Sequence, residues 1–142
     1  MITQGVCDSF RLQLLNGLQN FNTDHIYMAL YQDGLGTNLS PQITNYSSSG
    51  EIVASGYTAG GQLLTGQVTQ YQPGAAWVQW NNPSWMLPAG TPIDGALLYN
   101  ASKSNSAVLV LSFGSTRYPS PQGVFTVVFP PDPAINAILR LA

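Results

Sequence analysis

The feature that most constrains the fold of this chain is the apolar run from Ala107 to Leu111. Apolar side chains occupy five successive positions, so a strand here carries them on both of its faces. The β-branched residues and the stop at Gly114 favour a strand over a short buried helix. Both faces of this strand need cover. We therefore expect a second sheet on one face and a helix on the other.

A second apolar run, Ala96 to Tyr99, precedes the first one. The small polar segment from Asn100 to Ser106 separates the two runs and has the composition of a hairpin loop. The sequence therefore predicts a β-hairpin around which the other elements are arranged.

Residues 6 to 18 place apolar side chains four positions apart, which predicts one apolar stripe on a helix. The stripe consists of Val6, Phe10, Leu14 and Leu18. We assign residues 1–20 to an N-terminal helix, in which Gly17 weakens or ends the last turn. This helix is our candidate for the cover on the second face of the apolar strand.

Seven segments have the alternation or the β-branched and aromatic content of strands. They span residues 25–32, 62–72, 75–81, 93–99, 107–113, 123–129 and 135–141. Strands at these intervals are typical of sandwiches. We predict a mainly β fold, an antiparallel β-sandwich of about seven strands with one N-terminal α-helix. At 142 residues the chain fits a single domain, 1–142, with strands and loops over 24–142.

Charge is unusually scarce, since only 7% of the residues are Asp, Glu, Lys or Arg, where about 25% is ordinary. The four basic residues are scattered, which argues against nucleic acid or anionic lipid as a partner. They are Arg11, Lys103, Arg117 and Arg140. A nearly uncharged surface is poorly protected in free solution but costs little to desolvate against a neighbour. This favours a component of an assembly, with an ordinary charge-poor β-domain as the alternative.

No apolar run approaches the roughly 20 residues that span a bilayer. The N-terminal residues MITQGVCDSF lack the basic flank and apolar core of a signal peptide. We therefore expect a protein that neither spans a membrane nor is secreted by this route. The single cysteine, Cys7, excludes an internal disulfide and an ordinary zinc site. We expect it to be a small buried residue.

The residues suited to catalysis form no recognisable group. The only histidine, His25, lies beside Asp24 at the start of a strand, and the spacing indicates no partner nucleophile such as Ser9 or Cys7. The six carboxylates are spread over six segments, and no glycine segment has the pattern of a phosphate loop. We predict no catalytic residue, cofactor or metal, and expect His25 to face solvent. A small hydrolase built around His25 remains an alternative.

Two connections are too long or too stiff to be simple links between strands, namely residues 33–57 and the proline-rich residues 82–92. Loops of this kind are usually functional or mobile. We predict that they supply contacts with neighbouring subunits. The apolar residues that would anchor such an interface are Leu35, Leu39, Ile43, Tyr46, Trp85, Met86 and Leu87.

The three tryptophans, Trp77, Trp80 and Trp85, are suited to stacking on sugars. Alternation along a strand turns Trp77 and Trp80 to opposite faces, so we expect at least one of them in the core. A carbohydrate-binding β-sandwich module that uses an exposed tryptophan is therefore a further alternative.

Several blocks of the sequence, in their order along the chain, resemble a group of small virion structural proteins of tailed bacteriophages. They are CDSFRLQLLNGLQNF, GYTAGGQLLTG, GALLYNASKSNSAVLVLSFG, GVFTVVFP and AINAILRLA. The chain departs from the family at Ser112, where an Asp is usual. The resemblance covers nearly the whole chain and contains no catalytic motif.

The resemblance implies a protein of the virion without enzyme activity, assembled in the cytoplasm of a bacterial host. Its expected partners are the major capsid protein or other virion proteins, with several copies associated on the particle. We predict a capsid decoration or cement protein that binds and stabilises the capsid lattice. A tail or head-to-tail connector component is the alternative within the same class.

Overall fold

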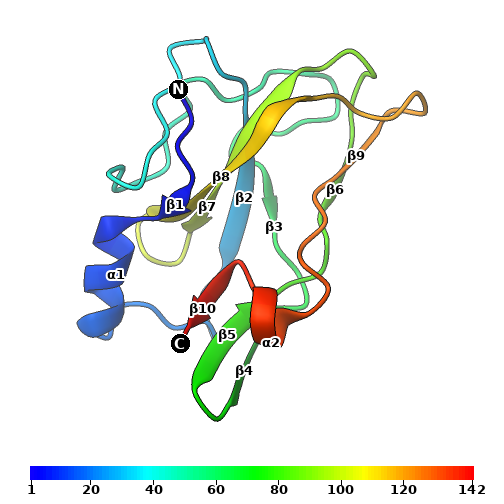
Figure 1. The fold of residues 1–142 in the computed structure, drawn as a ribbon. Coiled ribbons are helices and arrows are strands. Elements are labelled where there is room, and N and C mark those ends of the chain that lie inside the picture. The colour runs from blue at the N-terminus through cyan, green and yellow to red at the C-terminus, as the bar shows by residue number, and fades with distance from the viewer.

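The computed structural model describes residues 1–142 and is mainly β, with antiparallel sheets and two short helices (Figure 1). The N-terminal half contains β1 (Gly5–Val6), α1 (Asp8–Leu15), β2 (Ile26–Tyr31), β3 (Gln62–Leu63) and β4 (Val68–Gln72). It is followed by β5 (Ala75–Gln79), β6 (Ser84–Met86), β7 (Ile93–Asn100) and β8 (Ser106–Arg117). The chain ends with β9 (Val124–Thr126), α2 (Pro133–Asn136) and β10 (Leu139–Leu141).

The strands form three sheets, with orders β1-β8-β7-β2-β3, β10-β5-β4 and β6-β9. The predicted hairpin is confirmed, since β7 and β8 pair antiparallel at the centre of the largest sheet. Its loop turns through Ser104 and Asn105, both left-handed with φ of 55° and 57°. Ten strands in three sheets replace the expected sandwich of about seven strands.

One face of the five-stranded sheet is covered by residues 33–57. The pairing of β2 with β7 has no slip, so Tyr31 and Tyr99 lie on the same face. Tyr46 stacks on Tyr99 with ring centroids 4.8 Å apart, and the Tyr31 hydroxyl donates to the Ser47 carbonyl at 2.6 Å. A loop therefore covers this face, where we expected a helix.

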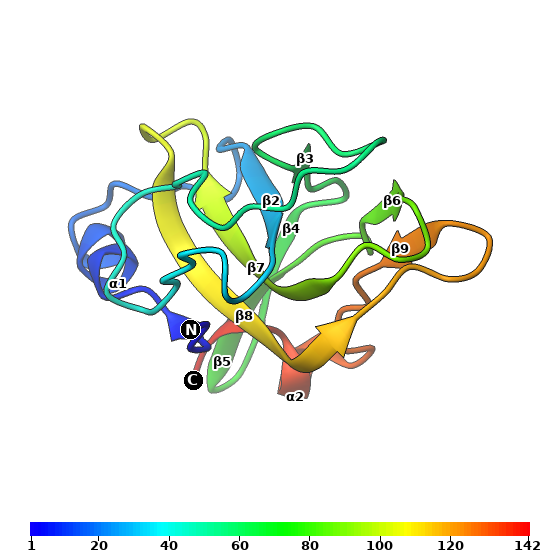
Figure 2. The same cartoon turned by 90° about the horizontal axis from the view of Figure 1, so that it is seen from above.

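The three-stranded sheet lies on the other side of the five-stranded sheet from residues 33–57 (Figures 1 and 2), and its Val78 and Leu139 belong to the same hydrophobic core. A second sheet therefore lies on this side, as one of three sheets and not as half of the predicted seven-stranded sandwich. The helix α1 lies against β8 and faces β5 and β10. Phe10 from α1 meets Phe21 at 5.8 Å between ring centroids, and Phe21 meets Trp80, just after β5, at 6.1 Å. The helix thus lies on the same side of the five-stranded sheet as the three-stranded sheet.

The N-terminal helix is shorter than the predicted residues 1–20. Residues 5 and 6 form β1, which pairs with Leu109 and Val110 of β8. This pairing satisfies backbone N–H and carbonyl groups, whereas the first turn of a helix would leave its N–H groups without partners. Gly17, at φ of 71°, is left-handed just beyond the C-cap residue and ends the helix as expected.

The predicted stripe is only partly correct. Phe10 is fully buried, whereas Val6 belongs to β1 and is half-buried. Leu14 is half-buried, and Leu18 is 53% exposed because the helix has already ended. The inward face of the helix therefore amounts to Phe10 with Leu14 beside it.

Several strand boundaries also differ from the prediction, and the predicted strand over residues 123–129 is reduced to β9. The segment 62–72 is split into β3 and β4, since Gly66 turns the chain at φ of 67°. Residues 84–86, within the proline-rich connection, form β6 and pair with β9. The segment 135–141 is not one strand: α2 occupies its start, with Pro133 in the first turn, and only β10 is extended.

Candidate protein-protein interfaces

Three of the predicted interface anchors are buried within the chain itself. Leu39, Trp85 and Leu87 belong to the main hydrophobic core. Leu39 forms a parallel bridge with Ile2, which precedes β1, and Trp85 packs against Phe125 across the β6–β9 pair. Their use as surface anchors is therefore wrong, because the domain needs these side chains for its own core.

The other predicted anchors divide into two groups. Ile43 and Tyr46 are half-buried and pack against the core. Leu35 and Met86 are exposed at 56% and 64%, and their role in an interface stays a prediction.

The predicted loop 33–57 is held to the domain by a buried carboxylate, Glu51. Its side chain accepts hydrogen bonds from the hydroxyls of Tyr46 and Tyr57 and from the Gly60 N–H, the last at 2.7 Å. The Tyr57 hydroxyl in turn accepts a bond from the Leu30 N–H of β2 at 3.0 Å. A buried carboxylate with three donors is well satisfied.

The surroundings of Glu51 keep the tyrosines protonated. Burial, reinforced by the hydrogen bond to Glu51, raises the pKa of Tyr46 and of Tyr57 far above the ordinary range. Burial, followed by the nearby Glu51 charge, raises the pKa of Tyr99 to about 12. Each hydroxyl therefore remains a donor at neutral pH. The hydrogen bonds to Glu51 connect the loop to the sheet.

The residues considered for catalysis lie apart. His25 is exposed, as expected, and its backbone N–H donates to Ser102 while no hydrogen bond joins its ring to Ser9 or Cys7. Cys7 is free and fully buried, as expected, and burial raises its thiol pKa to about 12. No three His, Cys, Asp or Glu side chains are grouped to hold a metal ion.

The three tryptophans are all buried. The expectation that at least one lies in the core is therefore confirmed. The exposed stacking platform that a sugar-binding module requires is not available from Trp77, Trp80 or Trp85, so the observation that favoured that alternative is lost.

An apolar groove of about 140 Å³ separates α1 from the three-stranded sheet. Phe10 and Leu14 line it from the helix, and Val78 and Leu139 line it from β5 and β10. Val78 and Leu139 are register partners, so they share the face of the sheet that continues into the core.

One step further along the same face, the sheet carries a row of three exposed residues that we call the open row. It consists of Tyr71, Ala76 and Leu141, which are register partners across β4, β5 and β10. Tyr71 is 84% exposed and Leu141 is 61% exposed. The open row extends the apolar groove out to solvent, and no part of the chain covers it.

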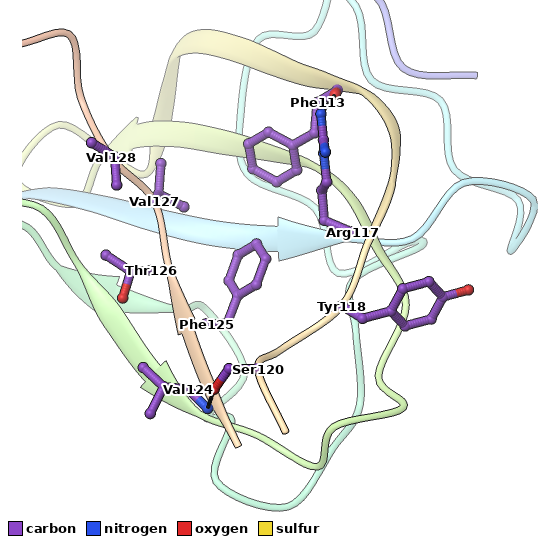
Figure 3. Close-up of a pocket in the computed structure, with 9 residues that line it drawn as sticks. All are labelled: Phe113, Arg117, Tyr118, Ser120, Val124, Phe125, Thr126, Val127 and Val128. Atoms are coloured by element: carbon purple, nitrogen blue, oxygen red, sulfur yellow. Dashed lines mark hydrogen bonds between the residues drawn. The ribbon is translucent and has the colours of Figure 1, made fainter. Parts of the chain in front are cut away.

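A second hollow, a cleft of about 640 Å³, lies between the end of β8 and β9 (Figure 3). Phe113 and Arg117 line it from β8, and the residues 124–128 line it from the side of β9. Figure 3 shows the Phe113 and Phe125 rings on its walls, while Tyr118 points away from them.

Neither hollow was predicted. The open row depends on the register of three strands, two of which lie more than sixty residues apart along the chain. The available signal was the alternation in β10, where Leu139 and Leu141 share a face. The cleft depends on the position of β9 relative to β8, and no local sequence pattern predicts that position.

Comparisons of the chain with protein-family models, with curated proteins and with solved structures gave no match. None of the helices is long and apolar enough to cross a bilayer.

Proposed function

We propose that this chain is a non-enzymatic virion structural protein of a tailed bacteriophage. Within that class we favour a decoration or cement protein that binds the capsid lattice. The observation that supports the proposal best is the open row, because exposed apolar side chains aligned across three strands are suited to packing against another protein. The phage assignment itself draws on the resemblance of the sequence blocks.

The low charge of the chain supports the same function. The 142 residues include only four basic and six acidic ones. Few ionic groups therefore have to be desolvated when another protein covers the surface. Charged residues are also depleted from the centres of protein interfaces. A surface of this kind is better suited to a packed assembly than to free solution.

Binding through the open row is weak for one copy and strong for many. Complete burial of a large apolar side chain contributes about 1.5–3 kcal/mol, and the row offers only Tyr71 and Leu141 as large side chains. That gain is comparable to or smaller than the loss of freedom on association. A lattice that presents many sites, or a chain that associates with its own copies, adds avidity. The proposed function is accordingly stoichiometric stabilisation of a shell.

Electron microscopy of purified phage particles that encode this chain tests the location. Hundreds of copies distributed over the shell are expected for a decoration protein, whereas about a dozen at one vertex or on the tail would support the connector alternative. Absence of the chain from purified particles would contradict the proposed function as a whole.

The surface is tested by a double variant, Tyr71→Glu with Leu141→Glu, in the phage. Both positions are exposed, so the purified chain should keep its melting temperature, while the two new charges should remove it from particles. The matched control is Ser49→Glu, which adds a charge at an exposed position of the loop on the other side of the five-stranded sheet. Full occupancy of the double variant would exclude the open row as the interface.

A further inference from the structure

The cleft between β8 and β9 runs along an open strand edge. Five successive residues, 124–128, line it, although the buried residues Phe125 and Val127 alternate with exposed ones. A cavity over one face of a strand contacts only every second residue, so a cavity lined by all five follows the edge. β9 pairs with β6 alone, and no residue of β6 lines the cleft. The edge concerned is therefore the one that faces away from β6. Ser120 occupies it at Val124, where the Ser120 N–H donates to the Val124 carbonyl at 2.8 Å, so the open part of the edge begins at Thr126.

The backbone at this edge has hydrogen-bonding groups to offer. The Val127 N–H donates to the Pro83 carbonyl at 3.0 Å, on the side of β6. Because successive backbone groups alternate in direction, those of Thr126 and Val128 are turned toward the cleft. Neither the N–H nor the carbonyl of Val128 makes a hydrogen bond in the structure.

The walls of the cleft are apolar. Phe113 and Phe125 meet with ring centroids 6.1 Å apart, at the end of β8 and on β9 respectively. Six of the nine lining residues are hydrophobic. The volume of about 640 Å³ is within the usual range for a bound ligand, roughly 300–1,000 Å³.

The only charged residue that lines the cleft is Arg117. Its guanidinium donates one long bond, 3.4 Å, to the Phe113 carbonyl and has no carboxylate partner. A guanidinium presents several donors in a planar fork that matches a carboxylate. The charge of the cleft is therefore complementary to an acidic group.

We propose that this cleft binds an extended segment of a partner protein, which adds to β9 as a further strand. The segment places an apolar side chain against Phe113 and Phe125 and an aspartate or glutamate on Arg117. This inference rests on the proposed function as a protein that binds other proteins, and it names the chemistry of one partner. Strand addition accounts for the open backbone groups, and the alternation of side chains along the added strand supplies specificity.

The test is selection of a randomised library of seven-residue peptides on the purified, immobilised chain. The enriched peptides should alternate apolar residues with polar ones and carry one Asp or Glu at a fixed position. A selected peptide should bind Arg117→Gln about five- to tenfold more weakly, since one charge-assisted hydrogen-bonding group is lost. The control is Arg140→Gln, another exposed arginine without a carboxylate partner, whose side chain donates to Ala134. That control should bind unchanged.

A second measurement locates the peptide on the strand edge. Hydrogen exchange at the amides of Thr126 and Val128 should slow when the selected peptide is bound, and Val128→Pro, which lacks the N–H, should bind more weakly. If Val128→Pro does not fold, the hydrogen-exchange rates and the binding to Arg117→Gln are sufficient to test the proposal.

The proposal is overturned by any of four results. They are no enrichment over a bare support, enriched peptides without an acidic residue, equal binding to Arg117→Gln, or binding without protection of Thr126 and Val128. These experiments use only the chain and peptides, so their failure leaves the location of the chain on particles, and hence the proposed function, untouched. Absence from particles would likewise leave the peptide measurements valid.

Discussion

Residues 33–57 contain no helix or strand, whereas β10, β5 and β4 form a regular antiparallel sheet. The loop nevertheless buries Leu39 and Ile52 in the main core, while the sheet leaves Tyr71 and Leu141 exposed. An irregular segment thus contributes apolar side chains to the core, while a regular sheet leaves two of its large apolar side chains exposed.

The difference follows from how each region satisfies its polar groups. The loop has no continuous series of strand-pairing hydrogen bonds, so individual hydrogen bonds hold it in place. Glu51 accepts three of them, and the Tyr31 hydroxyl donates one to the Ser47 carbonyl. The three-stranded sheet satisfies its backbone internally and therefore needs no cover for that purpose. The outer part of its apolar face is therefore exposed in the isolated chain.

The largest effect is expected from replacing residues 33–49 by a short Gly-Ser link. The loop covers one face of the five-stranded sheet, so the replacement removes Leu39 from the core and exposes the face that carries Tyr31. We expect loss of cooperative unfolding, since the change removes several side chains that each contribute kilocalories to a total stability of about 5–15 kcal/mol. Circular dichroism during heating measures this. A replaced chain that unfolds cooperatively near the original temperature would show that the loop is dispensable.

The next effect concerns the carboxylate that ties the loop down. Glu51→Ala leaves the Tyr46 and Tyr57 hydroxyls and the Gly60 N–H without their acceptor. We expect a loss of about 3–5 kcal/mol in the free energy of unfolding, since each unsatisfied buried group costs about 1–3 kcal/mol. Urea denaturation gives the value. Glu51→Gln, which keeps the side-chain volume and one acceptor oxygen, should lose less. Equal losses for the two variants would exclude volume and assign the whole effect to the lost carboxylate.

A single side chain sharpens the comparison further. Leu39→Ala removes a buried leucine from a segment without regular structure, and we expect a loss of about 2–5 kcal/mol, as for leucines in helices and sheets. The same urea experiment applies. A loss below about 0.5 kcal/mol, the range of ordinary surface substitutions, would mean that the loop moves away from the core in solution.

The sequence predicted the centre of the molecule correctly, because periodicity and turn composition are local. The hairpin of β7 and β8, the strand β2 and the helix end at Gly17 follow from residues close together in the chain. The apolar run 107–111 also led correctly to the demand for cover on both of its faces. It could not identify the cover, because a helix and a well-tied loop both satisfy that demand.

The interface residues were predicted from a weaker argument. The length and low charge of the two loops predict a binding surface, yet Leu39, Trp85 and Leu87 are part of the core. Glu51, whose hydrogen bonds hold the loop, is an acidic residue in a polar segment, and no sequence pattern around it indicates this role. The open row depends on pairing between Tyr71 and Leu141 through Ala76, which is a property of register and not of spacing.

Alkaline pH should weaken the interior of the molecule. Burial raises the Cys7 thiol pKa from 9.0 to about 12, so the unfolded chain loses this proton first. Stability is therefore complete below about pH 9 and falls as the pH rises toward 12, by about 1.4 kcal/mol per pH unit for one such group. Tyr99, whose pKa is raised to about 12, adds to the decline above pH 10.

Cys7→Ala isolates the thiol contribution. Urea denaturation under reducing conditions, at pH 8.5 to 11, should show a shallower decline for the variant than for the original chain, whatever their difference at neutral pH. Parallel declines would mean that the thiol ionises in the folded state as readily as in the unfolded one.

The smallest effect on stability is expected for Tyr71, a largely exposed side chain of a regular strand. Tyr71 lies in β4, is 84% exposed, and its ring is absent from every aromatic contact of the chain. Tyr71→Ala should therefore change the free energy of unfolding by no more than about 0.5 kcal/mol, the range of ordinary surface substitutions.

Leu39→Ala is the matched comparison, because it shortens an apolar side chain in a segment without a ladder and is expected to cost several times more. If Tyr71→Ala destabilised the isolated chain as strongly as Leu39→Ala, the tyrosine would pack against its own sheet in solution. The open row would then be a part of the core, and its role as a surface for another protein would lose its support.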